Sequence, residues 1–373
     1  MTATLNPSSS FSFLVRNTAA QRDTFHAAFA ILENAIATRV FPGCALAVTL
    51  RGELIAHHAA GRFTYDPASP SVQPDTIFDL ASVSKAVATT TMAMILYERG
   101  LLDLDAPVAA IVPEFLTGDA RRRDVTIRML LAHSSGLPAY EKLFLRAQTR
   151  DELLTAAFTT ALTADPGDRA EYSDIGFIIL GVALERLADE SLDHFCQHEI
   201  FGPLGMAHTT FNPPESWKDR IAPTADDQTF RQRIIQGEVQ DENASVLGGV
   251  AGHAGVFAPA EDVAAFAHTL LNGGRPLLRP ETIDLFTRRE SAPPGTSRAL
   301  GWDTPSSPSQ SGKHFGPRSY GHLGYTGTSL WIDPDRRLSI TLLTNRTWPD
   351  CQNQAIKQVR PVVHDAVIEA IGV

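Results

Sequence analysis

The sequence predicts an α+β fold: a mostly antiparallel β-sheet, built from both chain ends and flanked by helices, with an inserted helical lobe. Strand-like alternation marks residues 43–61 and 329–345, whereas helical spacing with proline and glycine punctuation dominates residues 105–245. Strands at both ends with helices between them favour one sheet closed by the two termini. We therefore expect an α/β domain from residues 1–104 and 246–373, a mostly helical domain from 105–245, and a functional site in the cleft between them.

The composition is that of a globular protein, and it excludes several classes of partner. The chain has 373 residues, of which 43% are hydrophobic and 20% are charged, so it can build a large core. Its net charge is −10 and it has no basic arm, so nucleic acid is not an expected partner. The longest apolar run, residues 177–184, is far shorter than the roughly 20 residues of a membrane span. We therefore expect no integral membrane segment.

Cysteine usage and the N-terminal residues bear on the compartment. Cys44, Cys196 and Cys351 are widely spaced and form no paired motif, so we expect buried thiols and no disulfide framework. Residues 1–17 lack a basic segment followed by a long apolar one, which export requires. These observations predict a cytoplasmic protein, or a periplasmic one if a leader has been trimmed from the sequence.

The N-terminal part of the chain predicts a helix, a hairpin and a second helix. Apolar residues recur at threes and fours over 22–39, which indicates an amphipathic helix. Residues 43–61 read as two short strands around the turn at Arg51 and Gly52. A second helix contains Ser82 and ends at Gly100.

The C-terminal part returns to strands after a glycine-rich segment. From residue 246 the pattern predicts, in order, the glycine-rich stretch LGGVAGHAGVF, a helix over 260–272, a Ser/Pro loop over 303–319, two strands around Asp333–Arg336, and a helix over about 353–371. No internal repeat is visible in the sequence.

One lysine stands out in the stretch LASVSKAVATTTMA, residues 80–93. Lys85 is its only charge, and Ser82 lies three residues earlier, on the same face of a helix. Burial disfavours the charged form of a lysine, so we expect the pKa of Lys85 to fall and its amine to accept a proton from the neighbouring hydroxyl. The alternative is a lysine whose stem packs on apolar neighbours while its ammonium reaches solvent.

A tyrosine and a glycine-rich strand provide two further candidate pieces. Tyr172 follows a Pro-Gly turn and directly precedes an apolar helix, so its phenol could project from a loop. Alternatively it only packs ahead of the Ser173 and Asp174 helix cap. In YGHLGYTGTSLWIDP, residues 320–334, glycines would let a substrate backbone lie against the strand. His322 would then lie near the pocket, although a lone histidine in a turn is more often solvated.

The three pieces together resemble one family. Ser-x-x-Lys, then Tyr-x-Asp before another helix, then His-x-Gly on a late strand resemble the motifs of the class C β-lactamase and penicillin-binding-protein superfamily. The resemblance is strongest to its esterases, D-aminopeptidases and low-molecular-weight D,D-carboxypeptidases. The stretches TIFDLASVSK, MLLAHSSGLP, PGDRAEYSDIGFIILG, FGPLGM and GGVAGHAGVF extend it over nearly the whole chain. It implies a β-lactamase/transpeptidase-like fold.

The resemblance also implies roles for individual residues. The implied catalytic residues are Ser82 as the acylated nucleophile, Lys85 as its partner amine, and Tyr172 as the proton-transferring tyrosine. The implied substrate-binding residues are Asp174, His322, Gly324 and Tyr325. The backbone N–H groups of Ser82 and Tyr325 are the expected oxyanion donors. We expect the neighbouring ammonium to lower the pKa of Tyr172.

Two positions depart from the family pattern. Asp174 stands where asparagine is common, so a carboxylate that only accepts hydrogen bonds replaces an amide that can donate one. His322-Leu323-Gly324 replaces Lys-Thr-Gly, which removes a permanent cation and a hydroxyl. Both changes weaken the expectation of efficient β-lactam turnover, whereas the acyl-transfer residues are unaffected.

The resulting hypothesis is a β-lactamase-related serine hydrolase that acts through a Ser82 acyl-enzyme. Its expected substrate is a small ester, a β-lactam or a D-amino-acid peptide, and its mechanism needs no metal and no cofactor. The alternative is a penicillin-recognising or ligand-binding protein of the same fold that does not turn its ligand over. The sequence contains no G-x-S-x-G elbow and no HExxH motif beside His194 and His198. It leaves the oligomeric state open.

Overall fold

The centre of the structure is a six-stranded β-sheet with the strand order β1-β3-β2-β11-β10-β9. The computed structural model describes residues 15–372. The strands of this sheet are β1 (Val15–Arg16), β2 (Gly43–Leu50), β3 (Glu53–Gly61), β9 (Tyr320–Leu323), β10 (Ser329–Asp333) and β11 (Leu338–Thr344). β1 runs parallel to β3, and the other neighbouring pairs are antiparallel. Because β2 pairs with β11, the prediction of one sheet built from both chain ends is confirmed.

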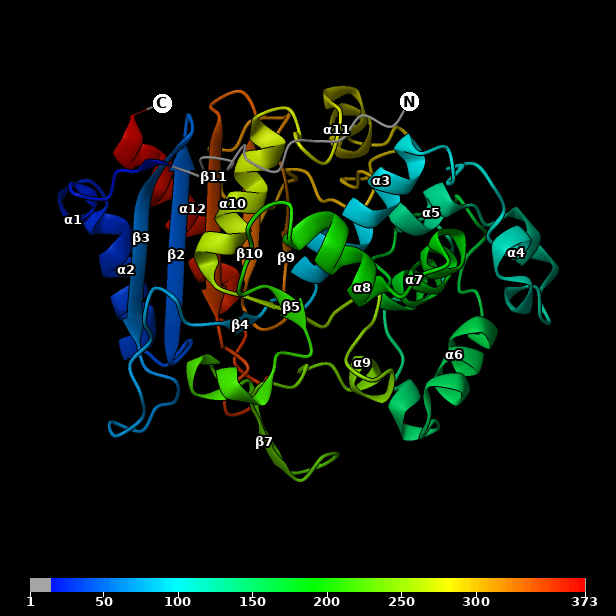
Figure 1. Ribbon diagram of the computed structural model, residues 1–373, viewed down its shortest axis with the longest axis horizontal. Coiled ribbons are helices and arrows are strands. Elements are labelled where there is room, and N and C mark those ends of the chain that lie inside the picture. The colour runs from blue at the N-terminus through cyan, green and yellow to red at the C-terminus, as the bar shows by residue number, and fades with distance from the viewer. Residues whose placement is uncertain (1–14, 373) are drawn as a thin grey trace, which may run out of the picture.

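Helices cover both faces of the sheet, as Figure 1 shows. The helices outside residues 105–245 are α1 (Gln21–Thr24), α2 (His26–Ala37), η1 (Lys85–Thr90), α3 (Thr91–Glu98), α10 (Ala260–Leu271), α11 (Pro280–Thr287) and α12 (Ile356–Ile371). Successive side chains of a strand point to opposite faces. Leu46 and Val48 of β2 accordingly share a core with α2 and α12, whereas Ala45 and Ala47 belong to the larger core that includes α10. The alternating pattern of the strand thus determines which helix covers which face.

Residues 105–245 are mostly helical and lie beside the sheet (Figure 1). Their elements are α4 (Val108–Ile111), η2 (Pro113–Phe115), η3 (Ala120–Asp124), α5 (Ile127–Leu131), η4 (Leu143–Leu145), α6 (Arg150–Thr159), α7 (Asp174–Ala188), α8 (Leu192–Cys196), η5 (Gln197–Phe201), β5 (Thr210–Phe211), η6 (Glu215–Arg220), β6 (Ala225–Asp227), β7 (Arg233–Ile235) and α9 (Glu242–Val246). Every residue from 175 to 184 in α7 is buried. The longest apolar run of the sequence is therefore a helix enclosed by protein on all sides.

A small second sheet leads into the candidate site. β4 (Phe78–Asp79) pairs with β8 (Val256–Ala258), which in turn pairs with β5. These pairings bring the segment before Ser82 next to the glycine-rich stretch that starts at residue 246. Among the described residues, no helix combines the length and the apolar character that crossing a membrane requires.

Most predicted elements are confirmed, and four predictions need correction. The helix expected over 22–39 is interrupted at Phe25, which separates α1 from α2. The helix expected to contain Ser82 begins after it, and the C-terminal helix begins at Ile356. Cys44 and Cys196 are buried as expected, but Cys351 is exposed, because it lies in the irregular segment between β11 and α12.

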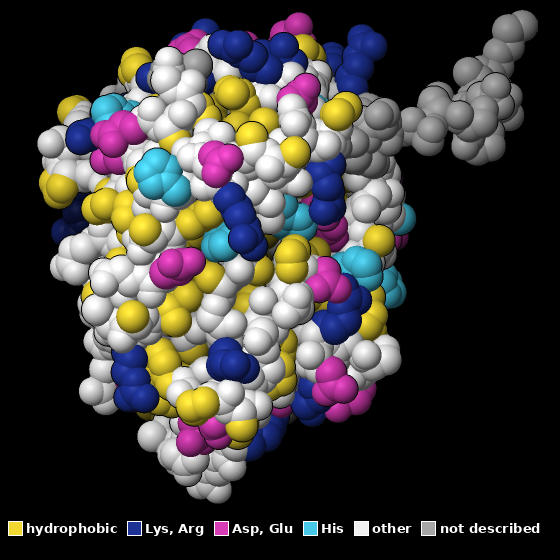
Figure 2. Space-filling model, turned by 90° about the vertical axis from the view of Figure 1, so that its left-hand side faces the viewer, with side chains coloured by type: hydrophobic (Ala, Val, Ile, Leu, Met, Phe, Trp, Pro, Cys, Tyr) yellow, Lys and Arg dark blue, Asp and Glu magenta, His cyan; other side chains and the backbone are white. Residues whose placement is uncertain are grey.

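Charges on the visible surface are mixed. Figure 2 shows the side of the molecule that carries α1 and β3, where acidic and basic side chains are interspersed among hydrophobic ones. This face presents no extended field of one sign.

Candidate active site

Ser82 lies in a tight turn between β4 and η1. The preceding residue, Ala81, has φ 47°, a left-handed conformation that costs a side-chain-bearing residue roughly 1–3 kcal/mol and tends to occur at functional sites. The buried carboxylate of Asp79 holds this turn. Its Oδ1 accepts the Ala81 N–H at 2.8 Å, and its Oδ2 accepts the Gln240 N–H at 2.6 Å. Burial raises the pKa of Asp79 to about 6.

Lys85 is fully buried beneath Ser82. Its Nζ donates to Ser82 Oγ at 2.9 Å, to Asp174 Oδ1 at 2.5 Å and to the His253 carbonyl at 3.0 Å. An ammonium has three N–H donors and no acceptor, so these three partners use its full capacity. The alternative in which Lys85 reaches solvent is wrong.

The close approach of a glycine explains how the His253 carbonyl reaches Lys85. A Cβ at Gly252 would lie 2.1 Å from the Phe177 carbonyl and 3.0 Å from Gly181 Cα, so only glycine lets this segment touch α7. The Gly252 carbonyl also accepts the Thr89 hydroxyl at 2.7 Å. The glycine-rich stretch thereby forms one wall around the lysine.

The electrostatic environment contradicts two sequence-based expectations, which concern the pKa values of Lys85 and Tyr172. Burial disfavours the charge on Lys85, but the Asp174 carboxylate and the Tyr172 phenol together outweigh this effect, and the pKa of Lys85 is raised above its ordinary value. Burial, together with Asp174, likewise raises the pKa of Tyr172 to about 12 despite the ammonium nearby. The expected fall of both pKa values is therefore wrong, because the carboxylate at position 174 has the largest favourable interaction with the lysine charge. Both side chains hold their protons at neutral pH.

Tyr172 and Asp174 reach the site from the start of α7. Ser173 caps this helix, because its Oγ accepts the Gly176 N–H at 3.0 Å and donates to the Pro138 carbonyl at 2.7 Å. The cap places Tyr172 in the preceding loop, as predicted, with its ring centroid 4.9 Å from Lys85 Nζ. The side chains of Lys85 and Ser82 act against the larger effect of burial, because both lower the pKa of the Tyr172 phenol.

His322 lies on β9 and is buried, so the solvated alternative is wrong. Its Nδ1 lies 2.9 Å from the Leu323 carbonyl and must donate to it, which leaves Nε2 as an acceptor. Nε2 has no hydrogen-bond partner in the described part of the chain. Burial, followed by the charge of Lys85, lowers the pKa of His322 to about 3. A neutral imidazole therefore stands where the family pattern has a lysine.

Gly324 and Tyr325 bring a loop against the turn that carries Ser82. A Cβ at Gly324 would lie 1.9 Å from Thr328 Oγ1 and 2.5 Å from the Leu80 carbonyl, so glycine is required for this approach. The backbone N–H groups of Ser82 and Tyr325 donate to no residue within 15–372. Both remain available to a ligand oxygen.

A cavity of about 770 Å³ collects these groups. The predicted residues that line it are Ser82, Tyr172, Asp174, His322, Gly324 and Tyr325, and Lys85 lies behind Ser82. The structure thus brings together all seven residues that the sequence singled out, from three separate segments of the chain.

Further polar residues line the cavity beside the predicted ones, among them Arg298 and His253. Arg298 lies with its guanidinium 5.4 Å from the Tyr172 ring centroid and 3.6 Å from Asp303. His253 Nε2 lies 2.8 Å from Asp241 Oδ1. His253 belongs to the glycine-rich stretch, which was one of the family-like segments, whereas Arg298 lies in an irregular segment with no motif to mark it.

The chain is similar in sequence to a family model and to curated proteins. Residues 28–362 match the family model described as Beta-lactamase. The chain is 34% identical over 343 residues, 82% of its length and 77% of the relative's, to an N-acetylmuramyl-L-alanine amidase of Bacillus subtilis (strain 168). It is 33% identical over 302 residues, 73% of its length and 69% of the relative's, to a putative D-alanyl-D-alanine carboxypeptidase of Escherichia coli (strain K12).

Solved structures show the same fold. A hydrolase with promiscuous acyltransferase activity superimposes with a TM-score of 0.77 at 23% identity, covering 93% of this chain and 99% of the other. A penicillin-binding protein homologue from Caulobacter crescentus superimposes with a TM-score of 0.74 at 22% identity, covering 93% and 98%. The matched motifs, the fold and the curated relatives together show that this chain belongs to the β-lactamase family of serine hydrolases.

Proposed function

We propose that the protein is a hydrolase that forms an acyl-enzyme on Ser82 with an ester or amide substrate. The observation that carries this proposal is the 2.9 Å contact between Lys85 Nζ and Ser82 Oγ at the edge of a cavity. Two unpaired backbone N–H groups beside it, from Ser82 and Tyr325, suit a tetrahedral oxyanion. A nucleophile, a proton-transfer partner and oxyanion donors are the parts that acyl transfer requires.

The resting hydrogen bonds define the order of proton transfers in this proposal. The Lys85 ammonium has no lone pair, so it must first lose a proton to solvent before it can act as a base. The neutral amine then takes the Ser82 hydroxyl proton as Oγ attacks the carbonyl carbon. Tyr172, which keeps its proton, donates it to the leaving group as the acyl bond to nitrogen or oxygen breaks. Water later attacks the acyl carbon and loses its proton to the Tyr172 phenolate. The Ser82 oxygen then leaves the acyl carbon with the proton that Lys85 took up, so all three side chains return to their starting states.

Arg298 favours substrates that carry a carboxylate. His322 is neutral, so it cannot replace the cation of the Lys-Thr-Gly pattern. The Arg298 guanidinium lines the same cavity, 5.4 Å from the Tyr172 ring centroid, and guanidinium groups bind carboxylates in a two-pronged geometry. The relatives named as an amidase and a carboxypeptidase support a substrate whose reacting amide bond lies near a carboxylate. Cell-wall peptide fragments are one class of compound with this chemistry.

A second candidate function follows from the Lys85 ammonium, whose three N–H donors all have partners. With Asp174 raising the pKa of Lys85, the resting amine is charged, and a protein that acylates but does not release its ligand has the same contacts. This candidate is a penicillin-recognising protein without turnover.

One experiment separates these functions. The purified protein and a Ser82→Ala variant are incubated with a penicillin and separately with a short-chain aryl ester, and intact mass and product release are followed together. Ester turnover or penicillin loss by the wild type alone supports the hydrolase, whereas a stable penicilloyl adduct without turnover supports the second candidate. Near-normal activity of Ser82→Ala would overturn the nucleophile assignment.

A further inference from the structure

The loop between β9 and β10, residues 324–328, carries the Tyr325 N–H and is held by an unusual number of hydrogen bonds. Each of its five carbonyls accepts at least one: Gly324 from Gly327 N and Arg360, Tyr325 from Arg346, Thr326 from Arg346 N and Thr344, Gly327 from Arg360, and Thr328 from Gly324 N and Arg360. When the carbonyls of a short loop are fixed on one side, the direction of the N–H groups is fixed as well.

Two arginine side chains provide four of these bonds. Arg360 of α12 donates from Nη2 to the Gly324 carbonyl at 2.5 Å and to the Thr328 carbonyl at 3.0 Å, and from Nε to the Gly327 carbonyl at 3.3 Å. Arg346 follows β11 and donates from Nε to the Tyr325 carbonyl at 2.6 Å. Its guanidinium also lies 4.4 Å from the centroid of the Tyr325 ring.

Neither arginine forms an ion pair with a carboxylate in the described part of the chain. Arg346 also donates to the carbonyls of Cys351 and Asn353, and Arg360 also donates to the Gln310 amide oxygen. Both side chains are 4% exposed. Burial and the neighbouring charge of Arg346 lower the pKa of Arg360 to about 9. Burying two like charges without counter-ions costs folding free energy. These two charges therefore lower the stability of the folded protein.

The same loop is tied to the turn that carries Ser82. Thr326 Oγ1 donates to the Asp79 carbonyl at 2.8 Å, and Thr328 Oγ1 donates to the Leu80 carbonyl at 2.8 Å. The Tyr325 N–H and the Ser82 N–H therefore belong to one connected frame. The arginines hold the loop through its carbonyl groups, and the threonines connect the loop to the turn that carries Ser82.

We propose that Arg346 and Arg360 are positioning residues for the oxyanion site. They fix the loop that carries the Tyr325 N–H, and they bring two positive charges without counter-ions close to the oxyanion site. This proposal rests on the proposed acyl-enzyme function. Preorganised donors and charges stabilise the transition state more than the ground state, so their loss affects kcat and not substrate affinity.

The test compares Arg360→Met and Arg346→Met with Arg122→Met. Arg122 is a matched control, because it is 1% exposed, donates only to backbone carbonyls, has no carboxylate partner in the described residues and does not line the cavity. Hydrolysis of an aryl ester gives kcat and KM. The affinity for phenylboronic acid, which adds to a serine hydroxyl as a tetrahedral anion, reports on the oxyanion site directly.

We expect each cavity arginine variant to lose at least about tenfold in kcat with KM within about twofold, which is less than the loss of a donor itself. Boronate affinity should fall in parallel, and Arg122→Met should keep both values even if its thermal stability falls. A lysine retains the positive charge and can donate in one of the directions that the arginine uses, so Arg360→Lys and Arg346→Lys should recover part of kcat. These lysine variants also replace a methionine variant that does not fold.

Two results would overturn the proposal. One is an unchanged kcat and boronate affinity in the folded variants. The other is a rise of KM restricted to carboxylate-bearing substrates, which would make the arginines substrate ligands. Failure of the acyl-enzyme function itself is distinguishable, because Ser82→Ala would then retain wild-type turnover.

Discussion

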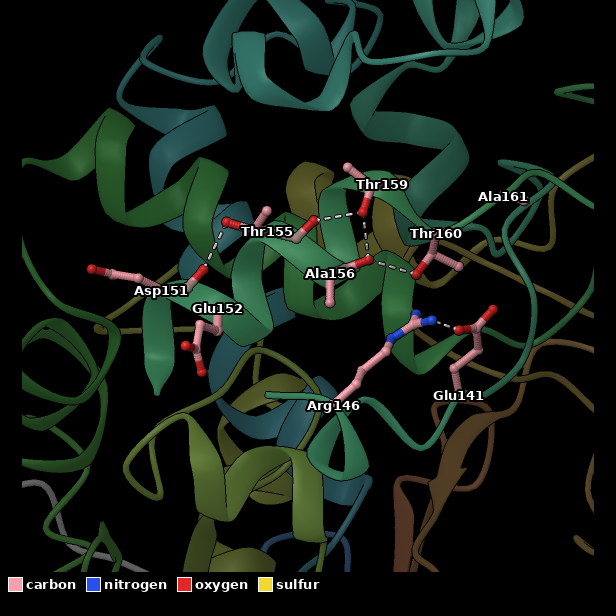
Figure 3. A pocket seen from close by; sticks show the side chains of 9 residues that line it. All are labelled: Glu141, Arg146, Asp151, Glu152, Thr155, Ala156, Thr159, Thr160 and Ala161. Carbon is pink, nitrogen blue, oxygen red and sulfur yellow. Dashed lines mark hydrogen bonds and ion pairs between the residues drawn. The ribbon is translucent and has the colours of Figure 1, made fainter. Parts of the chain in front are cut away.

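Two hollows of nearly equal size differ in what their polar groups do. The cavity beside Ser82 measures about 770 Å³, and a hollow beside α6 measures about 780 Å³. Figure 3 shows the second, where Arg146 pairs with Glu141 at 2.7 Å and the Thr155 hydroxyl bonds the Asp151 carbonyl of its own helix at 2.8 Å. The polar side chains that Figure 3 joins by dashed lines are thus already satisfied by one another or by their own helix.

The cavity beside Ser82 is built differently. It is lined by His322, whose buried Nε2 has no hydrogen-bond partner, and by Ser82 and Tyr325, whose backbone N–H groups have no partner among residues 15–372. The fully buried Lys85 lies behind Ser82. Volume therefore does not distinguish a functional cavity from a surface hollow. The unpartnered polar atoms and the buried lysine with its raised pKa do distinguish the two, because such features cluster at functional sites.

The largest fall in activity is expected when a proton-transfer residue is removed. Lys85→Ala and Tyr172→Phe should each lower kcat/KM for an aryl ester by roughly a thousandfold or more, because members of one catalytic unit fail together. Steady-state kinetics on variants with wild-type thermal unfolding curves checks this. A loss below tenfold in either folded variant would remove that residue from the mechanism.

The next effect concerns selectivity for charged substrates. Arg298→Met should lower kcat/KM for a carboxylate-bearing substrate by about tenfold to a hundredfold, since a hydrogen bond to a charged group contributes roughly 1.5–3 kcal/mol. The matched substrate with a neutral amide in place of the carboxylate serves as the control and should change by less than about twofold. An equal loss on both substrates would contradict a role in carboxylate recognition.

Asp174→Asn should move the pH profile of kcat/KM. Asp174 raises the pKa of Lys85, and a base that must lose its proton before it acts becomes inactive as the pH falls below its pKa. Wild-type activity should therefore rise with pH into the alkaline range. Removing the carboxylate should shift this rising limb to lower pH by roughly one to three units. An unshifted limb would mean that Asp174 does not control the protonation of Lys85.

The smallest effect is expected in the surface hollow. Arg146→Ala breaks a pair whose arginine side chain is 56% exposed, and such pairs contribute about 0–1 kcal/mol. Ester turnover should stay within about twofold of wild type, and the midpoint of denaturant unfolding should move only slightly. A tenfold loss of turnover would show that the hollow communicates with the cavity beside Ser82, and the contrast drawn between the two would be wrong.

Local patterns in the sequence determined the elements and the identity of the reacting groups. Alternation in residues 43–61 and 329–345 identified strands that indeed pair in one sheet, and the cap at Ser173 placed Tyr172 in a loop. The spacing of Ser82 and Lys85 placed a hydroxyl one turn from an amine. These features depend on backbone periodicity and on neighbours within about four residues, which the sequence displays directly.

Only the tertiary structure decided which charges meet. Asp174 contacts Lys85 across 89 positions of the chain, and that contact turned an expected fall of the lysine pKa into a rise. Arg298, Arg346 and Arg360 reach the cavity from segments without a recognisable motif. The physical reason is that a pKa and an electrostatic field depend on distance and burial in space, and neither quantity is encoded in the spacing of residues along the chain.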